Sequence, residues 1–252
     1  MNDAYVKYEI ENHVASIEFF HPKGNSFPSS QLQKLIEIIN DLGKNDDARV
    51  IVIKSAGDNI FCAGASFDEL LLIEDFETGT TFFSGFANLI LAMRNCPKFI
   101  IGCVEGKVVG GGVGIVAACD YALAMYNASI RLSELSIGIG PFVIEPAITR
   151  KIGIQAFSEL TLNPKEWVSS EWCLKHGFYN KTFSNPADLE KATLEFTEQL
   201  SQYSPEAMKN LKSIFWENAR NWDEIMPKRA AMSGKLVLSD FTKETLNKFK
   251  SK

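Results

Sequence analysis

Two glycine-rich segments contain the residues best suited to chemistry. Residues 61–68 read Phe-Cys-Ala-Gly-Ala-Ser-Phe-Asp, and residues 106–114 include three consecutive glycines. Each segment follows an apolar, strand-like run, at 50–54 and at 99–104, and leads into a helix-like stretch. A turn from strand to helix leaves backbone N–H groups unpaired at the positive end of the helix dipole, and glycine lets a ligand approach closely. Two such turns facing each other would form an oxyanion hole for a carbonyl that gains negative charge.

Strand-like and helix-like segments alternate along the chain and must position these turns. The nearly continuous apolar runs at 50–54 and 99–104 predict strands that are covered on both faces of a sheet. Strands are expected at 6–10, 14–20, 50–54, 99–104 and 121–125, and helices at 28–42, 80–94 and 113–119. This alternation predicts an α/β fold with crossover connections between strands.

The last quarter of the chain has a different pattern. From about residue 186 the strand-like segments stop, and only helix-like segments follow. Helices are expected at 189–202, 205–221, 223–238 and near 243–250. The sequence therefore predicts a helical region after an α/β core.

The composition argues against several functional classes. A net charge of −5 over 252 residues provides no clustered positive charge for nucleic-acid binding. The five cysteines occur singly, without Cys-x-x-Cys spacing, so no metal site is expected. No uninterrupted apolar stretch reaches about 18 residues and the N-terminus lacks a signal-peptide pattern, which predicts a soluble, cytoplasmic protein that binds no membrane. No nucleotide or flavin motif occurs either, so no cofactor is expected.

In order and spacing, several segments resemble the enoyl-CoA hydratase/isomerase (crotonase) superfamily. They are residues 21–27, 61–65, 110–112, 118–120 and 133–141. The resemblance implies a crotonase-type α/β core over 1–185, built as a spiral of ββα turns with the CoA-binding and catalytic turns. It implies a helical C-terminal region over 186–252 that serves oligomerisation and pocket closure. A homotrimer or homohexamer is expected, because family members are typically trimers or paired trimers.

The resemblance also implies a reaction on an acyl-CoA substrate, with coenzyme A entering as part of that substrate. Acyl-CoA chemistry in this family passes through a thioester enolate or a related transition state. By motif position, Ala65 and Gly111 donate their N–H groups to the thioester oxygen, and Glu134 is the carboxylate that moves the proton. Gly114 stands where hydratases of the family carry a second glutamate. One of the two usual carboxylates is therefore absent.

The loss of one carboxylate favours double-bond migration over hydration. Addition of water across a C=C bond needs a group that activates water and a proton for the neighbouring carbon, which two carboxylates share. Migration from the 3,4 to the 2,3 position needs a single base, whose pKa is raised into the useful range by burial. We therefore expect an isomerase with Glu134 as its base. Hydration of a 2-enoyl-CoA, decarboxylation of a branched acyl-CoA, and a catalytically degenerate acyl-CoA-binding subunit remain alternatives.

Glu145 lies in an otherwise apolar run, and two interpretations of it stay open. Its carboxylate could cap the following helix, because Pro146 suits the first helical position. Alternatively it enters the pocket and replaces the carboxylate that is missing at Gly114, which would restore hydration. Replacement of Glu145 by glutamine would separate these interpretations.

Recognition of coenzyme A is expected near the first glycine turn. By resemblance, Lys23 is a candidate phosphate contact, and a solvated lysine is the other interpretation. Backbone groups around Ala63 and Ser66 would receive the adenine. Asp68 and Glu69 occupy the region where the family often has a lysine, so phosphate recognition departs from the family pattern.

The acyl group is expected on the other side of these turns. Gly110, the first glycine of the triplet, is a candidate substrate-binding residue. Phe82, Phe83, Phe86 and Leu89 fall on the predicted 80–94 helix, where they either line the acyl pocket or pack in the core.

Overall fold

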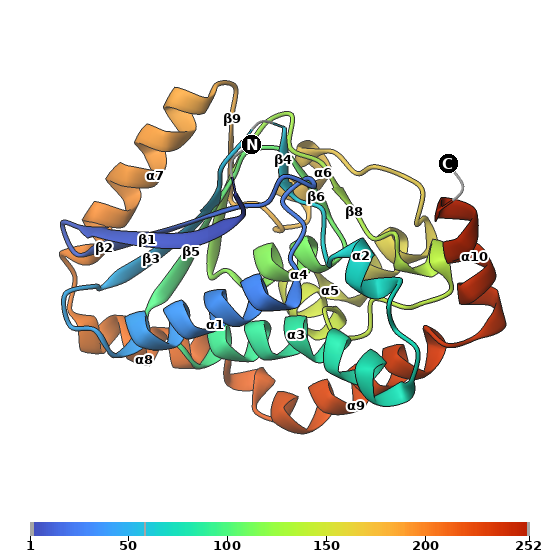
Figure 1. Cartoon of the computed structure of the whole chain (residues 1–252). Coiled ribbons are helices and arrows are strands. Elements are labelled where there is room, and N and C mark those ends of the chain that lie inside the picture. Colours follow the sequence, from blue (N-terminus) through green and yellow to red (C-terminus); the bar gives the residue numbers. More distant parts are fainter. Residues whose placement is uncertain (1–2, 58, 251–252) are drawn as a thin grey trace.

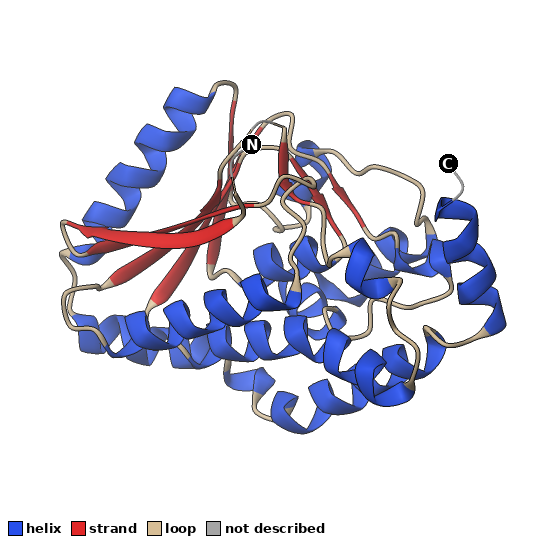
Figure 2. Cartoon of the chain, in the orientation of Figure 1, coloured by secondary structure: helices blue, strands red, loops and turns tan. Residues whose placement is uncertain are grey.

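The described part of the chain, residues 3–57 and 59–250 of a computed structural model, forms two sheets with helices around them (Figures 1 and 2). Residues 251–252, at the end of the predicted C-terminal region, lie outside it. The larger sheet has the strand order β1-β2-β3-β5-β7-β9. Its strands are β1 (Tyr5–Glu11), β2 (Val14–Phe20), β3 (Val50–Ser55), β5 (Phe99–Val104), β7 (Tyr121–Met125) and β9 (Lys181–Phe183). The first two strands, both predicted, form an antiparallel hairpin, and all other neighbours pair parallel.

The central strands are buried as their apolar sequences predict. Every residue of β5 is buried, and so are the first four residues of β3. Helix α7 (Pro186–Ser201) packs against β3, β5 and β7, and Figure 1 shows it on the side of the sheet away from α1. A parallel sheet needs this cover because apolar side chains project from both of its faces.

A second, smaller sheet has the order β4-β6-β8, and sequence periodicity did not predict it. Its strands are β4 (Ile60–Cys62), β6 (Lys107–Val109) and β8 (Ile130–Arg131), and they pair parallel. Successive strands from β3 to β9 alternate between the two sheets, with helices inserted between turns. This alternation confirms the predicted spiral of ββα turns.

The helices of the core begin and end at recognisable signals. Helix α1 (Ser29–Lys44) buries the apolar face formed by Leu32, Leu35 and Ile39. Helix α3 (Phe76–Asn95) begins at a capping box, in which the Asp75 carboxylate accepts the Thr78 N–H and the Thr78 hydroxyl lies against the Asp75 backbone. Helix α4 (Gly111–Ala118) is buried along almost its whole length. Helices α1 and α4 both pack against α3, which thus forms the centre of the helical layer.

Helix α2 (Phe67–Leu70) is the helical stretch expected after the first glycine turn, and α5 (Glu145–Leu162) is the helix expected to begin near Pro146. The sequence predicted no bounds for these two helices or for α6 (Ser170–Lys175). In the C-terminal region, the helix predicted over 205–221 is wrong in length. Helix α8 (Pro205–Phe215) ends earlier, and a separate 3-10 turn follows at Glu217–Ala219. Helices α9 (Trp222–Leu236) and α10 (Asp240–Lys250) agree with the predicted segments.

The last two helices lie beside the glycine turns rather than on the larger sheet. Helix α9 packs along α3, and α10 packs against a 3-10 turn at Glu134–Ile137. Figure 1 shows α9 below α3 and α10 at the far end of the molecule from α7. Among the described residues, no helix is both long enough and apolar enough to cross a membrane.

Candidate active site

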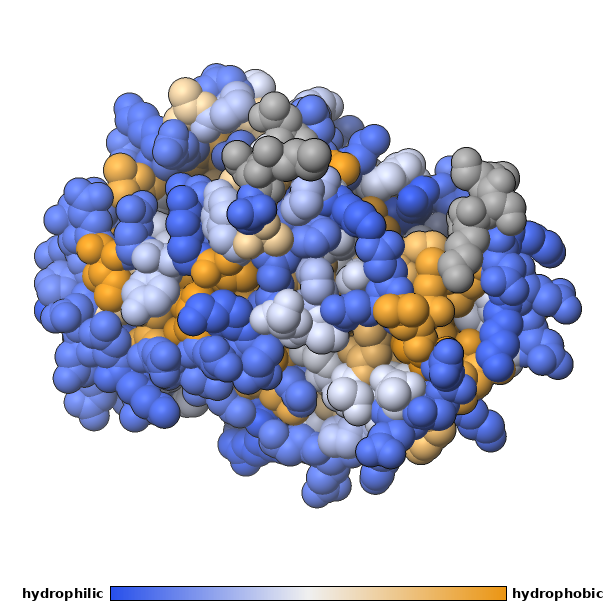
Figure 3. Space-filling model, viewed as in Figure 1, coloured by the Kyte–Doolittle hydropathy of each residue, from blue (hydrophilic) through white to orange (hydrophobic). Residues whose placement is uncertain are grey.

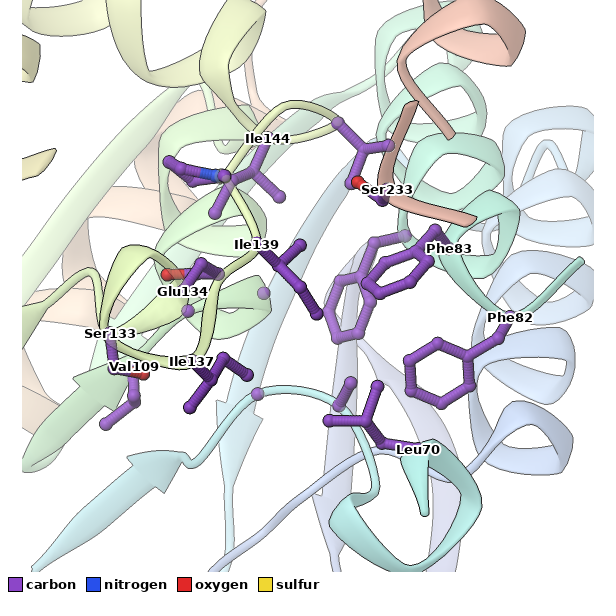
Figure 4. A pocket seen from close by; sticks show the side chains of 18 of the residues that line it. Leu70, Phe82, Phe83, Val109, Ser133, Glu134, Ile137, Ile139, Ile144 and Ser233 are labelled. Carbon is purple, nitrogen blue, oxygen red and sulfur yellow. The ribbon is translucent and has the colours of Figure 1, made fainter. Parts of the chain in front are cut away.

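A cavity of about 160 Å³ lies where the two glycine turns meet. Its walls come from α2, from α3, from the segment between residues 133 and 144, and from α9. In Figure 4, Glu134 lies on one side of this cavity, and Phe82 and Phe83 lie on the opposite side. Apolar side chains dominate the lining, and Glu134 is the only ionisable residue among the lining residues.

The first turn presents the backbone of Ala65 to the cavity. Gly64 has a φ of +91°, a conformation that favours glycine. The N–H of Phe27 donates to Gly64 O at 2.8 Å, and the N–H of Ser66 donates to Phe27 O at 3.1 Å. Phe27 and Ala65 thus pair as neighbours in a parallel sheet do. In this pairing both backbone hydrogen bonds of Phe27 go to the residues on either side of Ala65. The N–H of Ala65 itself therefore faces away from Phe27.

The second turn brings Gly111 against the first. Gly110 has a φ of +53°, and α4 begins directly after it at Gly111. A Cβ on Gly64 would lie 3.0 Å from Val109 O and 3.3 Å from Gly111 N, so the two turns are in contact. Within the described residues, the N–H groups of Ala65 and Gly111 have no hydrogen-bond acceptor. These two unpaired donors thus lie on adjoining turns, and both residues line the cavity.

The carboxylate of Glu134 lies directly beside the second turn. A Cβ on Gly110 would be 2.9 Å from Glu134 Oε1. Oε2 is shut off from solvent and has no hydrogen-bond partner in the described part of the chain. Burial raises the pKa of Glu134 to about 7, while the backbone N–H groups of Glu134 and Ser133 act in the opposite direction. At neutral pH this group can both accept and return a proton.

The position of the missing second carboxylate is closed by an apolar side chain. A Cβ on Gly114 would lie 2.4 Å from Ile144 Cγ2 and 3.5 Å from Ile90 Cδ1. Ile144 is buried and also lines the cavity. Any side chain at position 114 would therefore displace Ile144. The cavity wall is apolar at the point where a second acid would stand.

Comparison with known proteins agrees with this geometry. The model of the enoyl-CoA hydratase/isomerase family matches residues 9–252. The chain belongs to this family. Its fold is that of the crotonases: an enoyl-CoA hydratase from Bacillus halodurans superposes with a TM-score of 0.90 at 20% identity, covering 97% of this chain and 99% of that one.

Curated relatives in the enoyl-CoA hydratase/isomerase family differ in their reactions. The chain is 23% identical over 249 residues to a probable enoyl-CoA hydratase of Bacillus subtilis, covering 98% of this chain and 96% of the relative. It is also 23% identical over 257 residues to a trans-2-decenoyl-[acyl-carrier-protein] isomerase of Streptococcus mutans, covering 98% and 95%. At these identities the family is shown and the individual reaction is not.

Glu145, the candidate replacement acid, lies outside the cavity of this family member. Its Oε2 is 2.8 Å from Arg229 Nη1 on α9, and its Oε1 accepts a hydrogen bond from the Thr149 hydroxyl at 2.8 Å. It is the first residue of α5, and it makes no side-chain cap at the helix start. The structure thus corrects both interpretations of Glu145, because the carboxylate is occupied by a link between α5 and α9.

The predicted aromatic residues lie where an acyl group would extend from the turns. Phe82, Phe83 and Phe86 all line the cavity, whereas Leu89 does not. Phe86 also belongs to the buried core, and Phe82 packs in a smaller apolar cluster with Val237, which follows α9, and Leu246 of α10. A Cβ on Gly111 would be 2.4 Å from the Phe86 ring, so the aromatic wall directly abuts the oxyanion turn. Lining the pocket and packing in the core are both observed.

The residues predicted to bind coenzyme A are not all at the cavity. Ala63 and Gly110 line it, whereas Lys23 and Ser66 do not. Lys23 is exposed and pairs with Asp68, and the Ser66 hydroxyl caps α2 by accepting the Glu69 N–H at 3.3 Å. Ser66 thus has a structural role at the start of α2, next to the first oxyanion turn.

Ile144 and Ser233 are among the cavity residues that sequence reasoning missed. Ile144 lies in the apolar run around Glu145, and that run could have suggested a wall residue. Ser233 lies on α9, 89 positions after Ile144, and no sequence signal points to it. Only packing of α9 along α3 brings Ser233 to the cavity.

Proposed function

We propose that this protein moves a carbon–carbon double bond within an enoyl-CoA, from the 3,4 to the 2,3 position, with Glu134 as its only general base. The observation that carries this proposal is the single buried carboxylate beside two unpaired backbone N–H groups. Family membership supports the acyl-CoA substrate. The choice of migration over hydration rests on the cavity itself.

The reaction needs only the groups that line the cavity. The thioester oxygen binds between the N–H groups of Ala65 and Gly111, which stabilise its negative charge as the enolate forms. Ionised Glu134 removes a proton from C2, and the electron pair shifts through the diene-like enolate toward C4. The protonated carboxyl then returns the same proton to C4. No atom is gained or lost, and the carboxylate is regenerated.

The wall formed by Gly114 and Ile144 supports migration over hydration. Syn hydration requires a water molecule held on one face of the alkene by acidic partners. Here Gly114 has no side chain, and the buried Ile144 occupies the space that a side chain at position 114 would need. Water in such an apolar niche would lack the two to four polar partners that hold it in place.

A product analysis tests the proposal. The purified protein is incubated with 3-enoyl-CoA and with 2-enoyl-CoA thioesters of matched length, and products are identified by mass and by double-bond position. We expect migration without a change of mass. A gain of one water by the 2-enoyl-CoA would instead establish hydration, and tight binding without turnover of either substrate would establish a binding subunit.

The expected homo-oligomer is also a proposal. Large apolar side chains are exposed on α8, at Leu211, Ile214 and Phe215, and on α5, at Ile154 and Leu162. Burial of such side chains between subunits would stabilise an assembly. Light scattering on the purified protein should give a trimer or hexamer mass, and a monomer would reject the proposal.

A further inference from the structure

Ser233 is a buried polar residue in the otherwise apolar wall of the cavity. It lies on α9, is 1% exposed, and lines the same cavity as Glu134. Its hydroxyl oxygen has no hydrogen-bond partner within the described residues. In Figure 4 this oxygen is turned toward the segment that carries Ile144.

The missing partner is unusual for a serine inside a helix. Such hydroxyls commonly bond to the carbonyl three or four residues earlier. Thr161 and Thr193 in this chain do so, at 2.9 Å to Phe157 O and 2.8 Å to Leu189 O. Ser233 makes no such bond, although the carbonyl of Arg229 is four residues earlier. A buried hydroxyl without a partner destabilises the folded chain. Because Ser233 also lines the cavity, a bound ligand can supply the partner that the protein does not.

The surroundings of Ser233 restrict what that partner can be. The neighbouring wall is apolar, with Phe83, Val143 and Ile144 among the lining residues. Glu134 is the only ionisable residue of the lining, and Figure 4 places it on the opposite side from α9. A charged group at Ser233 would have no counter-ion there and would be costly to desolvate. The partner is therefore a neutral hydrogen-bonding group.

We propose that Ser233 determines substrate specificity by hydrogen bonding to a neutral oxygen, a hydroxyl or a keto group, on the acyl chain away from the thioester. This inference rests on the proposed function, because it assumes that the acyl group enters the cavity from the oxyanion turns. A cavity of about 150 Å³ holds a molecule the size of benzene, and this cavity is about 160 Å³. The substrate is thus a short oxygenated enoyl thioester, with about six non-hydrogen atoms in its acyl chain.

Binding of saturated thioesters tests this without requiring turnover. Dissociation constants are measured by calorimetry for hexanoyl-CoA, for its 4-, 5- and 6-hydroxy derivatives and for its 4- and 5-oxo derivatives. We expect at least one oxygenated ligand to bind about ten-fold more tightly than hexanoyl-CoA, the effect of one neutral hydrogen bond in a dry pocket. In Ser233→Ala the ratio of the two dissociation constants, hexanoyl-CoA over the oxygenated ligand, should fall to about one.

A matched control separates ligand recognition from helix packing. Thr80 also has a buried hydroxyl without a partner at the crossing of α3 and α9, but it does not line the cavity. Thr80→Val should keep the wild-type preference. Adipoyl-CoA, which ends in a charged carboxylate, should show no gain over hexanoyl-CoA.

Two outcomes would overturn the inference. One is that no oxygenated ligand binds more tightly than hexanoyl-CoA, and the other is that Ser233→Ala keeps the preference. Failure of the proposed function would look different: 3-enoyl-CoA would not isomerise, while the binding preference and its loss in Ser233→Ala would remain.

Discussion

At the scale of single residues, the environment of Glu134 determines how the site responds to pH. Burial raises the pKa of its carboxyl to about 7, and the ionised form is the one that removes a proton. We expect kcat/KM for double-bond migration to rise about ten-fold per pH unit below pH 7 and to level off above it. A pH–rate profile between pH 5.5 and 9 measures this. A profile that is flat across pH 7 would contradict the assignment of Glu134.

Replacement of Glu134 by glutamine should lower kcat/KM by about 10²- to 10⁴-fold. The stability of this variant provides the control. Because the pKa of Glu134 is raised in the folded state, the protonated carboxyl at low pH favours the folded chain. This stability is lost as the pH rises through about 7 and the buried carboxyl ionises. Glu134→Gln should therefore be more stable than the wild type at pH 8, so that lost activity is not lost folding.

The pair Gly114 and Ile144 gives a second prediction at this scale. If the apolar wall is what prevents hydration, Gly114→Glu combined with Ile144→Ala should introduce both an acid and the space for water. We expect hydration of 2-enoyl-CoA to exceed that of the wild type by about 10²-fold, the usual contribution of a placed acid or base. The control is Gly114→Gln with Ile144→Ala, which has the same volume and no acid. Equal hydration by both variants would show that Ile144 alone controls the outcome.

At the scale of elements, the link between α5 and α9 holds one wall of the cavity. Arg229 on α9 contacts the Glu145 carboxylate at 2.8 Å and the Phe142 carbonyl at 3.5 Å, on either side of the lining residues Val143 and Ile144. We expect Arg229→Gln and Glu145→Gln each to raise KM about two- to five-fold, as for a partly exposed ion pair, with little change in kcat.

The two changes should not be additive, because they break the same contact. Lys228→Gln, an exposed neighbour on α9, is the matched control and should leave KM unaltered. A large fall in kcat for Glu145→Gln would instead return this residue to a catalytic role.

The elements differ in how well the sequence predicts them. Strands β3 and β5 were expected because their apolar runs are continuous, and α1 because its apolar residues recur at helical spacing. Strands β4, β6 and β8 have only two or three residues each, too few for any periodicity to appear. Their pairing is nevertheless what brings Gly64 against Gly111.

The residues of the candidate site also differ in how well the sequence predicts them. The glycine turns and Glu134 could be chosen from local motifs and resemblance, since each motif is continuous in the chain. Ile144, Ser233 and the pairing of Glu145 with Arg229 depend on which helices pack together, and no local pattern records this. Glu145 in particular was an isolated acid in the sequence, and its partner lies 84 positions away on α9.

At the scale of the whole molecule, the C-terminal region is divided between two tasks. Helices α7 and α8 pack on the larger sheet, whereas α9 and α10 lie around the cavity. Figure 3 shows apolar residues gathered between α2 and α10. Packing along α3 sets the position of α9, and with it the positions of Ser233 and Arg229, while α8 precedes α9 in the chain and lies on the sheet.

A buried ion pair holds α8 in place. Lys212 Nζ lies 3.0 Å from Asp120 Oδ2, and both side chains are 2% exposed. Lys212 also donates to Lys98 O at 2.7 Å, while Asp120 accepts from the Ile100 N–H at 2.8 Å and from the Trp216 indole at 2.7 Å. Every charge in this pair thus has hydrogen bonds beyond its ionic partner, as a stable buried pair requires.

Removal of one partner should leave an uncompensated buried charge. We expect Lys212→Met to lower the free energy of unfolding by about 3–5 kcal/mol, measured by urea denaturation. Lys209→Met, an exposed lysine on the same helix, should change it by less than about 0.5 kcal/mol. Adding Asp120→Asn to Lys212→Met should recover part of the loss, because the orphaned charge is then gone. If the double variant is no more stable than Lys212→Met alone, the loss comes from packing of the lysine stem and not from the charge.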